Sequence, residues 1–221
     1  MNLIVMLTHK DQTVLNAHAI FEDCKHSKAQ YWGFKEKALP PAEMKMLYDC
    51  MKACGKTTIL EVVEYTEDKC LDGARLAAEC GCDILMGTLF FDSVNAFCQA
   101  HHIKYMPFVG EVTERPSILN GSIESMIEEA RSYVEKGAYG IDLLGSRYTG
   151  DPLELNRQLV SQLDMPVCIA GSIDSYDRLD ELKEIAPWGF TIGGAFFEKK
   201  FGDDFCEQID NVYDYIDDTN K

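Results

Sequence analysis

Two short apolar runs near the C-terminus, residues 167–170 and 190–192, each stop at small residues and then enter a predicted helix. Glycine lets the backbone approach a ligand closely with its N–H groups exposed. A helix N-terminus just behind such a turn adds partial positive charge. Two such turns side by side predict a phosphate-binding site. Its predicted residues are Gly171, Ser172, Gly193 and Gly194.

Acid–base chemistry is predicted for charged residues in or just after other apolar runs. Glu61 interrupts the run 59–63, and Asp142 interrupts the run 140–144 in the same way. A buried carboxylate is costly unless paired, and burial raises its pKa into a range that suits proton transfer. A lysine at a strand end can neutralise an oxyanion, hold a phosphate or form a Schiff base. The predicted catalytic residues are Glu61, Lys35, Asp142 and Glu111, and for each a purely structural ion pair or an exposed carboxylate remains the alternative.

Three further polar residues are predicted to contact a substrate. Arg147 lies in a glycine-framed loop, residues 145–151, and its guanidinium suits bidentate binding of a carboxylate or phosphate. Ser146 precedes it in the same loop. His9 follows the first predicted strand and belongs to the residue type that titrates near neutral pH.

The elements that must position these residues alternate along the chain. Helical patterns separate the predicted strands, and this alternation favours repeated βα units with a parallel sheet. We therefore predict one (β/α)8 TIM-barrel domain, residues 1–221, with the phosphate site after strands seven and eight. An open doubly wound sheet is the alternative, but no GxGxxG follows the first strand. The predicted strands are residues 3–7, 29–34, 57–63, 83–87, 104–109, 140–144, 167–170 and 190–192.

Composition restricts the partners. With 21 basic and 37 acidic residues the formal net charge is −16, which disfavours nucleic acid and anionic membranes. No apolar stretch approaches a membrane helix in length. Nine cysteines without paired metal spacing are interpreted as reduced, mostly buried thiols of a cytoplasmic protein. We predict no metal and no cofactor, and a phosphorylated small molecule as partner, bound by the monomer or by a homodimer.

Three segments carry a family resemblance: IDLLGSRYTG at 141–150, PVCIAGSI at 166–173 and TIGGAF at 191–196. They resemble ribulose-phosphate-binding (β/α)8 barrels, and residues 138–198 are similar to the C-terminal third of N-acylmannosamine-6-phosphate 2-epimerases. The resemblance implies a barrel with a phosphate site. The epimerase pattern has a glutamate before the strand-seven glycine, where this chain has Ala170. The layout is also similar to glycerol-operon antiterminator regulators, which use this barrel without known catalysis.

Two functions remain open from the sequence. The first is an enzyme that moves a proton next to a carbonyl of a small phosphorylated sugar or related metabolite, by isomerisation, epimerisation or aldol-type cleavage. The second is a non-catalytic regulator that binds a phosphorylated metabolite. A phosphoribosyl-transfer enzyme is a third and weaker hypothesis, because such an enzyme usually needs magnesium and the sequence shows no clear acidic magnesium motif.

Overall fold

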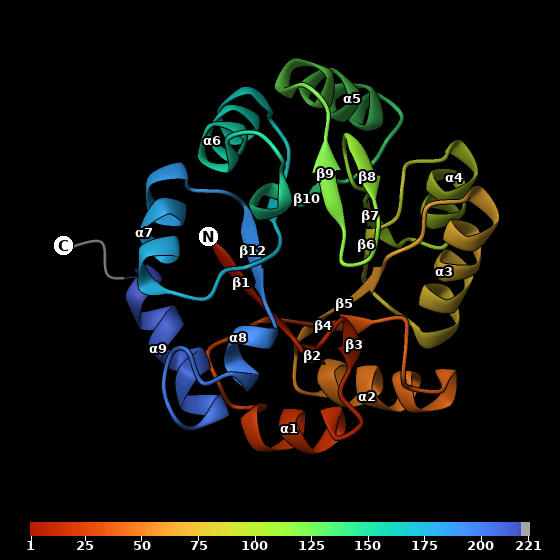
Figure 1. The fold of residues 1–221 in the computed structure, drawn as a ribbon. Helices are drawn as coiled ribbons and strands as arrows, with labels where there is room; N and C mark the ends of the chain where they lie inside the picture. The colour runs from red at the N-terminus through yellow and green to blue at the C-terminus, as the bar shows by residue number, and fades with distance from the viewer. Residues whose placement is uncertain (218–221) are drawn as a thin grey trace.

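The computed structural model describes residues 1–217, and in them eight parallel strands surround a common axis (Figure 1). The spatial order is β10–β11–β12–β1–β4–β5–β6–β7. A parallel bridge between Phe108 and Asp142 closes the ring, which excludes the open sheet. The strands are β1 (Asn2–Met6), β4 (Tyr31–Lys35), β5 (Thr57–Val62), β6 (Ile84–Gly87), β7 (Lys104–Met106), β10 (Ile141–Leu143), β11 (Val167–Ile169) and β12 (Gly189–Ile192).

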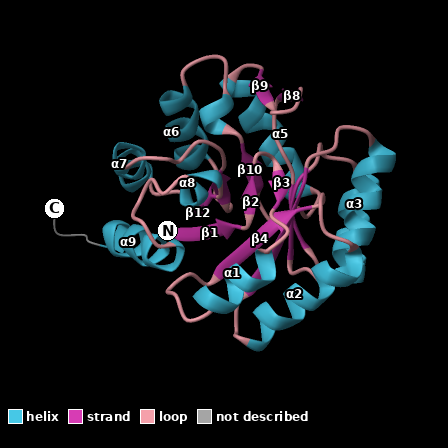
Figure 2. Cartoon of the chain, turned by 60° about the horizontal axis from the view of Figure 1, so that its bottom comes forward, coloured by secondary structure: helices cyan, strands magenta, loops and turns pink. Residues whose placement is uncertain are grey.

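Helices enclose the strands on the outside, as Figure 2 shows. The main helices are α1 (Ala17–Cys24), α2 (Pro41–Ala53), α3 (Glu67–Cys80), α4 (Asp92–Ala100), α5 (Ile123–Glu135), α6 (Pro152–Gln162), α7 (Tyr176–Ile185) and α9 (Phe205–Asp217). A single turn, α8 (Gly194–Phe197), follows β12, and a 3-10 turn, η1 (Gly145–Arg147), follows β10. The predicted (β/α)8 barrel is confirmed.

Local signals explain where several helices begin. Ser122, Asp151 and Ser175 each accept hydrogen bonds from backbone N–H groups in the first turn of α5, α6 and α7. Such caps satisfy donors that have no partner within the helix. Helix α3 ends at Gly81, whose φ of 75° is the left-handed conformation that glycine adopts without a Cβ penalty. These four helix boundaries are therefore encoded locally.

The barrel interior is apolar at mid-height. Ile4, Ile59, Ile84, Met106 and Cys168 pack there with less than 1% of their surface exposed. Further along the strands, towards their carboxyl ends, the same interior face carries Lys35 paired in register with Glu61. Charged groups thus lie on an apolar layer and face the open end of the barrel.

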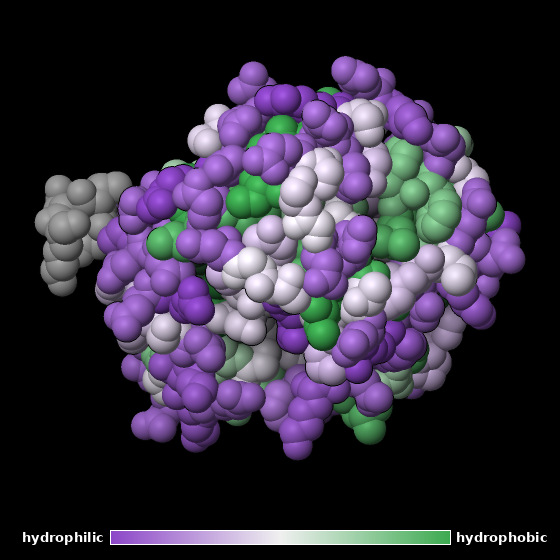
Figure 3. Space-filling model, turned by 45° about the horizontal axis from the view of Figure 1, so that its top comes forward, coloured by the Kyte–Doolittle hydropathy of each residue, from purple (hydrophilic) through white to green (hydrophobic). Residues whose placement is uncertain are grey.

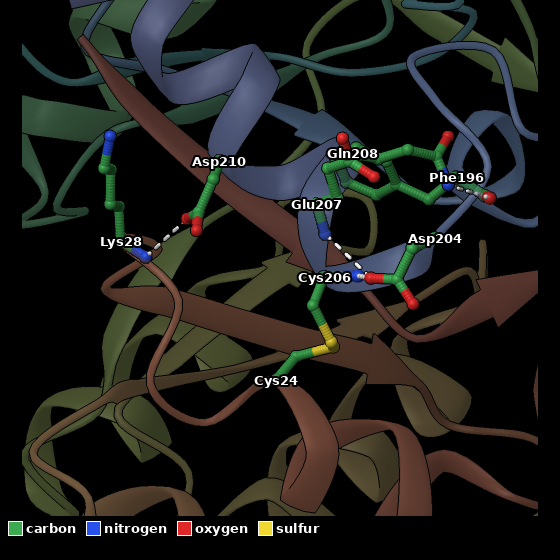
Figure 4. The surroundings of a disulfide bond; sticks show 8 residues. All are labelled: Cys24, Lys28, Phe196, Asp204, Cys206, Glu207, Gln208 and Asp210. Atoms are coloured by element: carbon green, nitrogen blue, oxygen red, sulfur yellow. Dashed lines mark hydrogen bonds between the residues drawn. A yellow bond between two sulfur atoms is a disulfide. The ribbon is translucent and has the colours of Figure 1, made fainter.

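A disulfide between Cys24 and Cys206 joins the end of α1 to the start of α9 (Figure 4). The expectation that all cysteines are reduced is wrong for this pair. The two residues are 182 positions apart in the sequence, so only the closure of the barrel brings them together. The free thiols of Cys70, Cys80, Cys82, Cys98 and Cys168 are buried, as predicted.

The outer surface is largely polar. In the face drawn in Figure 3, hydrophilic residues predominate and apolar ones form scattered patches. This agrees with the net charge of −16. None of the described helices combines the length and the apolar character that crossing a bilayer requires.

Candidate functional site

A cavity of about 680 Å³ opens at the carboxyl ends of the strands. One wall carries charged side chains from the first three βα units, namely Asp11, Lys35 and Glu61. The opposite wall consists of the turns after β11 and β12 together with Arg147. Barrel enzymes place their reactive groups at this end of the strands.

A two-residue hairpin positions Asp11. Strands β2 (Thr8–His9) and β3 (Gln12–Thr13) pair antiparallel, and their connecting residues Lys10 and Asp11 have φ of 49° and 63°. Two positive φ values match the twist of a tight hairpin. The Thr13 hydroxyl donates to the Lys35 carbonyl at 2.7 Å and accepts from the Lys35 N–H at 3.0 Å. These bonds anchor the hairpin to β4. Sequence analysis gave Asp11 no role, because hairpin pairing was not recognised.

Lys35 lies between two carboxylates. Its Nζ is 2.5 Å from Asp11 Oδ1 and 3.3 Å from Glu61 Oε1. Burial by itself lowers the pKa of Lys35, but Glu61 and Asp11 outweigh it and raise this pKa above its usual value. Likewise, burial raises the pKa of Asp11, yet the hydrogen bonds from Lys35 and Arg115 bring it below its usual value. At neutral pH the site therefore holds a lysine ammonium beside the charged Asp11 carboxylate.

Asp142 lies deeper in the barrel than the cavity wall. Its side chain is fully buried, and among the described residues neither carboxyl oxygen has a hydrogen-bond partner. Burial, and next the charge of Glu61, raise the pKa of Asp142 well above its usual range, while Lys35 opposes this shift. The carboxyl group is therefore neutral where an ordinary aspartate is charged.

The raised pKa of Asp142 makes stability depend on pH. From the usual carboxyl value upwards, the folded protein binds one proton more than the unfolded chain, so the free energy of unfolding falls as pH rises until the raised pKa is reached. One such group contributes a slope of about 1.4 kcal/mol per pH unit. We expect Asp142→Asn to lose this contribution, so that its stability relative to wild type rises between pH 5 and 8 in urea unfolding.

The matched control is Asp203→Asn, because the Asp203 side chain is fully exposed. Its stability should follow the wild-type curve at a constant offset. Parallel curves for Asp142→Asn and wild type would show that Asp142 ionises like an exposed carboxylate.

A second hairpin crosses the mouth of the barrel. Strands β8 (Glu111–Thr113) and β9 (Ile118–Asn120) run from the ring of helices towards the barrel centre (Figure 1). At its tip, Arg115 donates to Asp11, to Glu36 at 3.2 Å and to the Val63 carbonyl at 2.9 Å. Sequence analysis missed Arg115, because only the tertiary structure places it over the first three strands.

The same hairpin contacts the loop that carries Arg147. The Thr149 N–H donates to the Leu119 carbonyl at 3.0 Å, and the Tyr148 hydroxyl donates to the Gly121 carbonyl at 2.9 Å. The hairpin therefore connects both walls of the cavity.

The turn after β11 presents its backbone to the cavity. Gly171 and Ser172 have φ of 92° and 53°, a pair of left-handed residues. Within residues 1–217, neither N–H group donates a hydrogen bond to a protein acceptor. A Cβ added at Gly171 would lie 3.4 Å from Arg147 Nε, so the guanidinium adjoins this turn. Arg147 is exposed, lines the cavity and has no ion-pair partner in the described chain, so it is available to an anion.

The turn after β12 contains two glycines, and the space around a side chain would differ between the two positions. A Cβ at Gly193 would meet the Thr8 carbonyl oxygen at 2.9 Å, so close packing against the first strand excludes a side chain. At Gly194 the nearest atom would be 3.9 Å away, on His9. Both glycines line the cavity, and at Gly194 the space where a side chain would stand is open.

The remaining predicted residues lie near the cavity or outside it. His9 stacks on Phe197 with ring centroids 5.4 Å apart, and its Nε2 is 3.9 Å from Glu198. Ser146 is half-buried in η1. Glu111 is exposed at the base of the second hairpin and does not line the cavity, so the structure does not bring it to Lys35 and Glu61.

Comparison with known proteins agrees with this fold. No family model and no curated sequence matches the chain. Orotidine 5'-phosphate decarboxylase from Pyrococcus horikoshii OT3 superposes with a TM-score of 0.70 at 12% identity, over 97% of this chain and 98% of that one. Phosphoribosyl anthranilate isomerase from Thermus thermophilus gives 0.65 at 13% identity, over 98% of both chains.

The N-acetylmannosamine-6-phosphate 2-epimerase from Clostridium perfringens, from the group that the C-terminal segments resemble, is also similar. Its TM-score is 0.63 at 13% identity, over 88% of this chain and 86% of that one. At these identities the likeness establishes the shared barrel fold. The resemblance seen in the sequence is thus confirmed as a resemblance of fold.

Proposed function

We propose that this chain is an enzyme that moves a proton next to the carbonyl group of a small phosphorylated sugar or related metabolite. The observation that carries the proposal is the division of one cavity into two walls. One wall holds a lysine ammonium between carboxylates, and the other offers free backbone N–H groups beside Arg147. A volume of about 680 Å³ accommodates a molecule that spans the two.

Each wall has a separate task in the proposed reaction. The N–H groups of Gly171, Ser172 and Gly194, with Arg147, hold the phosphate. Glu61 takes the proton from the carbon next to the carbonyl, and the Lys35 ammonium stabilises the enolate oxygen that forms. Because its neighbours raise the pKa of Lys35, the amine is protonated, which favours charge stabilisation over Schiff-base formation.

Asp142 acts through Glu61 in this proposal. It does not line the cavity, so it cannot touch the substrate, but its carboxyl group interacts with the charge of Glu61 from below. A neutral Asp142 spares Glu61 the repulsion of a second buried negative charge. Asp142 is therefore assigned as a positioning residue.

Deuterium exchange tests the proposed reaction without knowledge of the product. A panel of aldose and ketose phosphates is incubated in D₂O, and loss of the proton next to the carbonyl is followed by NMR. We expect one or more compounds to exchange with wild type, and Glu61→Gln to bind the same compounds in thermal-shift assays without exchanging them. If wild type bound these compounds without exchanging the proton, the proposed enzymatic function would be excluded.

That last result would support the second function, a non-catalytic sensor of phosphorylated metabolites. Its favouring observation is the extensive ion pairing of the charged wall. Arg115 joins Asp11 to Glu36, and Lys35 joins Asp11 to Glu61, so these charges satisfy one another without a ligand. A sensor would bind its ligand through the other wall and show equal affinity in Glu61→Gln.

Removal of Arg147 tests the phosphate wall. A hydrogen bond to a charged group contributes about 1.5–3 kcal/mol, so we expect Arg147→Ala to weaken binding of inorganic phosphate and of sugar phosphates roughly 10- to 100-fold in calorimetric titrations. Arg157→Ala on α6 is the control, because Arg157 pairs with Glu184 outside the cavity. Equal affinity of both variants and wild type would locate the anion elsewhere.

A further inference from the structure

Three side chains of different chemistry meet on the outer face of the barrel, away from the cavity. His18 and Glu22 lie four residues apart on α1, and Cys50 faces them from α2. One ligand atom from each lies within 4.8 Å of the others. The spacing of these residues in the sequence gives no metal-site signal, because the three come from two different helices.

We propose that His18, Glu22 and Cys50 bind a zinc ion that clamps α1 to α2. One imidazole nitrogen, one carboxylate oxygen and one thiolate sulfur form a mixed donor set that suits Zn²⁺. Calcium and magnesium favour oxygen ligands alone. Three protein ligands leave the fourth tetrahedral position to water.

The geometry requires only small side-chain movements. Zinc binds sulfur at about 2.3 Å and nitrogen or oxygen at about 2.0–2.2 Å, so ligand atoms in a tetrahedral site lie roughly 3.5 Å apart. The Cys50 thiol now donates to Glu22 Oε1 at 2.7 Å. Zinc would replace the thiol proton, which passes to the buffer, and the two atoms would separate by less than an ångström.

A neighbouring cation already orients the carboxylate. Lys25 Nζ lies 2.9 Å from Glu22 Oε2, the oxygen that does not face Cys50. Lys25 can keep this contact while Oε1 binds the metal, as groups outside a coordination sphere commonly do. Since Cys24, also on α1, is bonded to α9, zinc would fix this helix to its neighbours on both sides.

Metal titration tests the site in the intact, oxidised protein. Metal-free wild type is titrated with Zn²⁺ in competition with a chromophoric chelator, and with Co²⁺ as a spectroscopic probe. We expect one equivalent to bind, a rise in the melting temperature, and a thiolate-to-cobalt charge-transfer band with the intense visible bands of tetrahedral cobalt. His18→Ala and Cys50→Ser should each lose at least 10-fold in affinity, and Cys50→Ser should lose the charge-transfer band.

Two matched variants separate this site from other ligands nearby. Cys54 is an exposed free thiol one turn beyond Cys50, and His26 lies beyond the end of α1. Cys54→Ser and His26→Ala should keep wild-type affinity. The proposal is overturned if wild type binds no equivalent of zinc. It is also overturned if His18→Ala binds zinc normally while Cys54→Ser does not, because the ligands would then be the thiols of Cys50 and Cys54. Circular dichroism of each metal-free variant verifies its fold.

Discussion

Replacement of Lys35 by methionine is expected to reduce turnover about 1000-fold, while the affinity for inorganic phosphate stays within a factor of three. In the proposed reaction the ammonium stabilises the enolate, and removal of one preorganised donor of this kind costs two to three orders of magnitude. In the proposed function, phosphate binds at the other wall. The measurements are deuterium exchange next to the carbonyl and calorimetric titration with phosphate.

The same substitution should also destabilise the fold by about 3 kcal/mol, because it leaves the largely buried Glu61 without its cation and leaves Asp11 with Arg115 alone. Lys35 has 14% of its side chain exposed, and so has Glu61. The double variant Lys35→Met with Glu61→Gln removes one of the unpaired charges and should recover part of the loss in urea unfolding.

Lys37→Met is the control for both effects. Lys37 belongs to the same strand end, but it is 45% exposed and its carboxylate partners are 3.6 Å or more away. Its stability should change by no more than about 0.5 kcal/mol, with turnover intact. If Lys35→Met turned over like Lys37→Met, the ammonium would have no part in the chemistry and the charged wall would be structural.

Loss of the Cys24–Cys206 disulfide is expected to lower the free energy of unfolding by about 3–5 kcal/mol. The bond closes a loop with a sequence separation of 182, and in the chain-entropy model a crosslink over so long a loop restricts the unfolded chain strongly. The measurement compares denaturant unfolding of the oxidised protein with that of Cys24→Ala/Cys206→Ala. Cys54→Ala, which removes an exposed free thiol, is the control and should unfold like wild type.

The bond also supports one wall of the cavity. Cys206 lies in the first turn of α9, where Asp204 accepts from its N–H (Figure 4). Two residues further on, the buried Gln208 donates to the Phe196 carbonyl at 2.9 Å, and Phe196 belongs to the turn that begins with Gly194. We therefore expect the alanine double variant to bind phosphate more weakly. Unchanged stability in that variant would mean that the crosslink leaves the unfolded chain little restricted.

Local patterns were sufficient to predict the eight barrel strands and the helical segments between them, but not the hairpins β2–β3 and β8–β9. Residues 67–80 and 205–217 carry the apolar periodicity of the helices α3 and α9 that they form, and cap residues such as Ser122 mark helix starts in the structure. The eight strand positions followed from short apolar runs between helical patterns, and all eight lie among residues 1–217. These signals are local, because they depend on side-chain periodicity and on the backbone preferences of single residues.

The sequence by itself determined the repeating βα order and the charged residues Lys35 and Glu61 on the strands. It also determined the turn of small residues around Gly171. Only the tertiary structure decided which of these meet. It brought Asp11 and Arg115 to Lys35 through two hairpins, buried Asp142 beneath the cavity, left Glu111 outside it, and joined Cys24 to Cys206. The reason is physical: contacts between distant positions depend on loop conformation and barrel closure, and neither leaves a periodic signal in the chain.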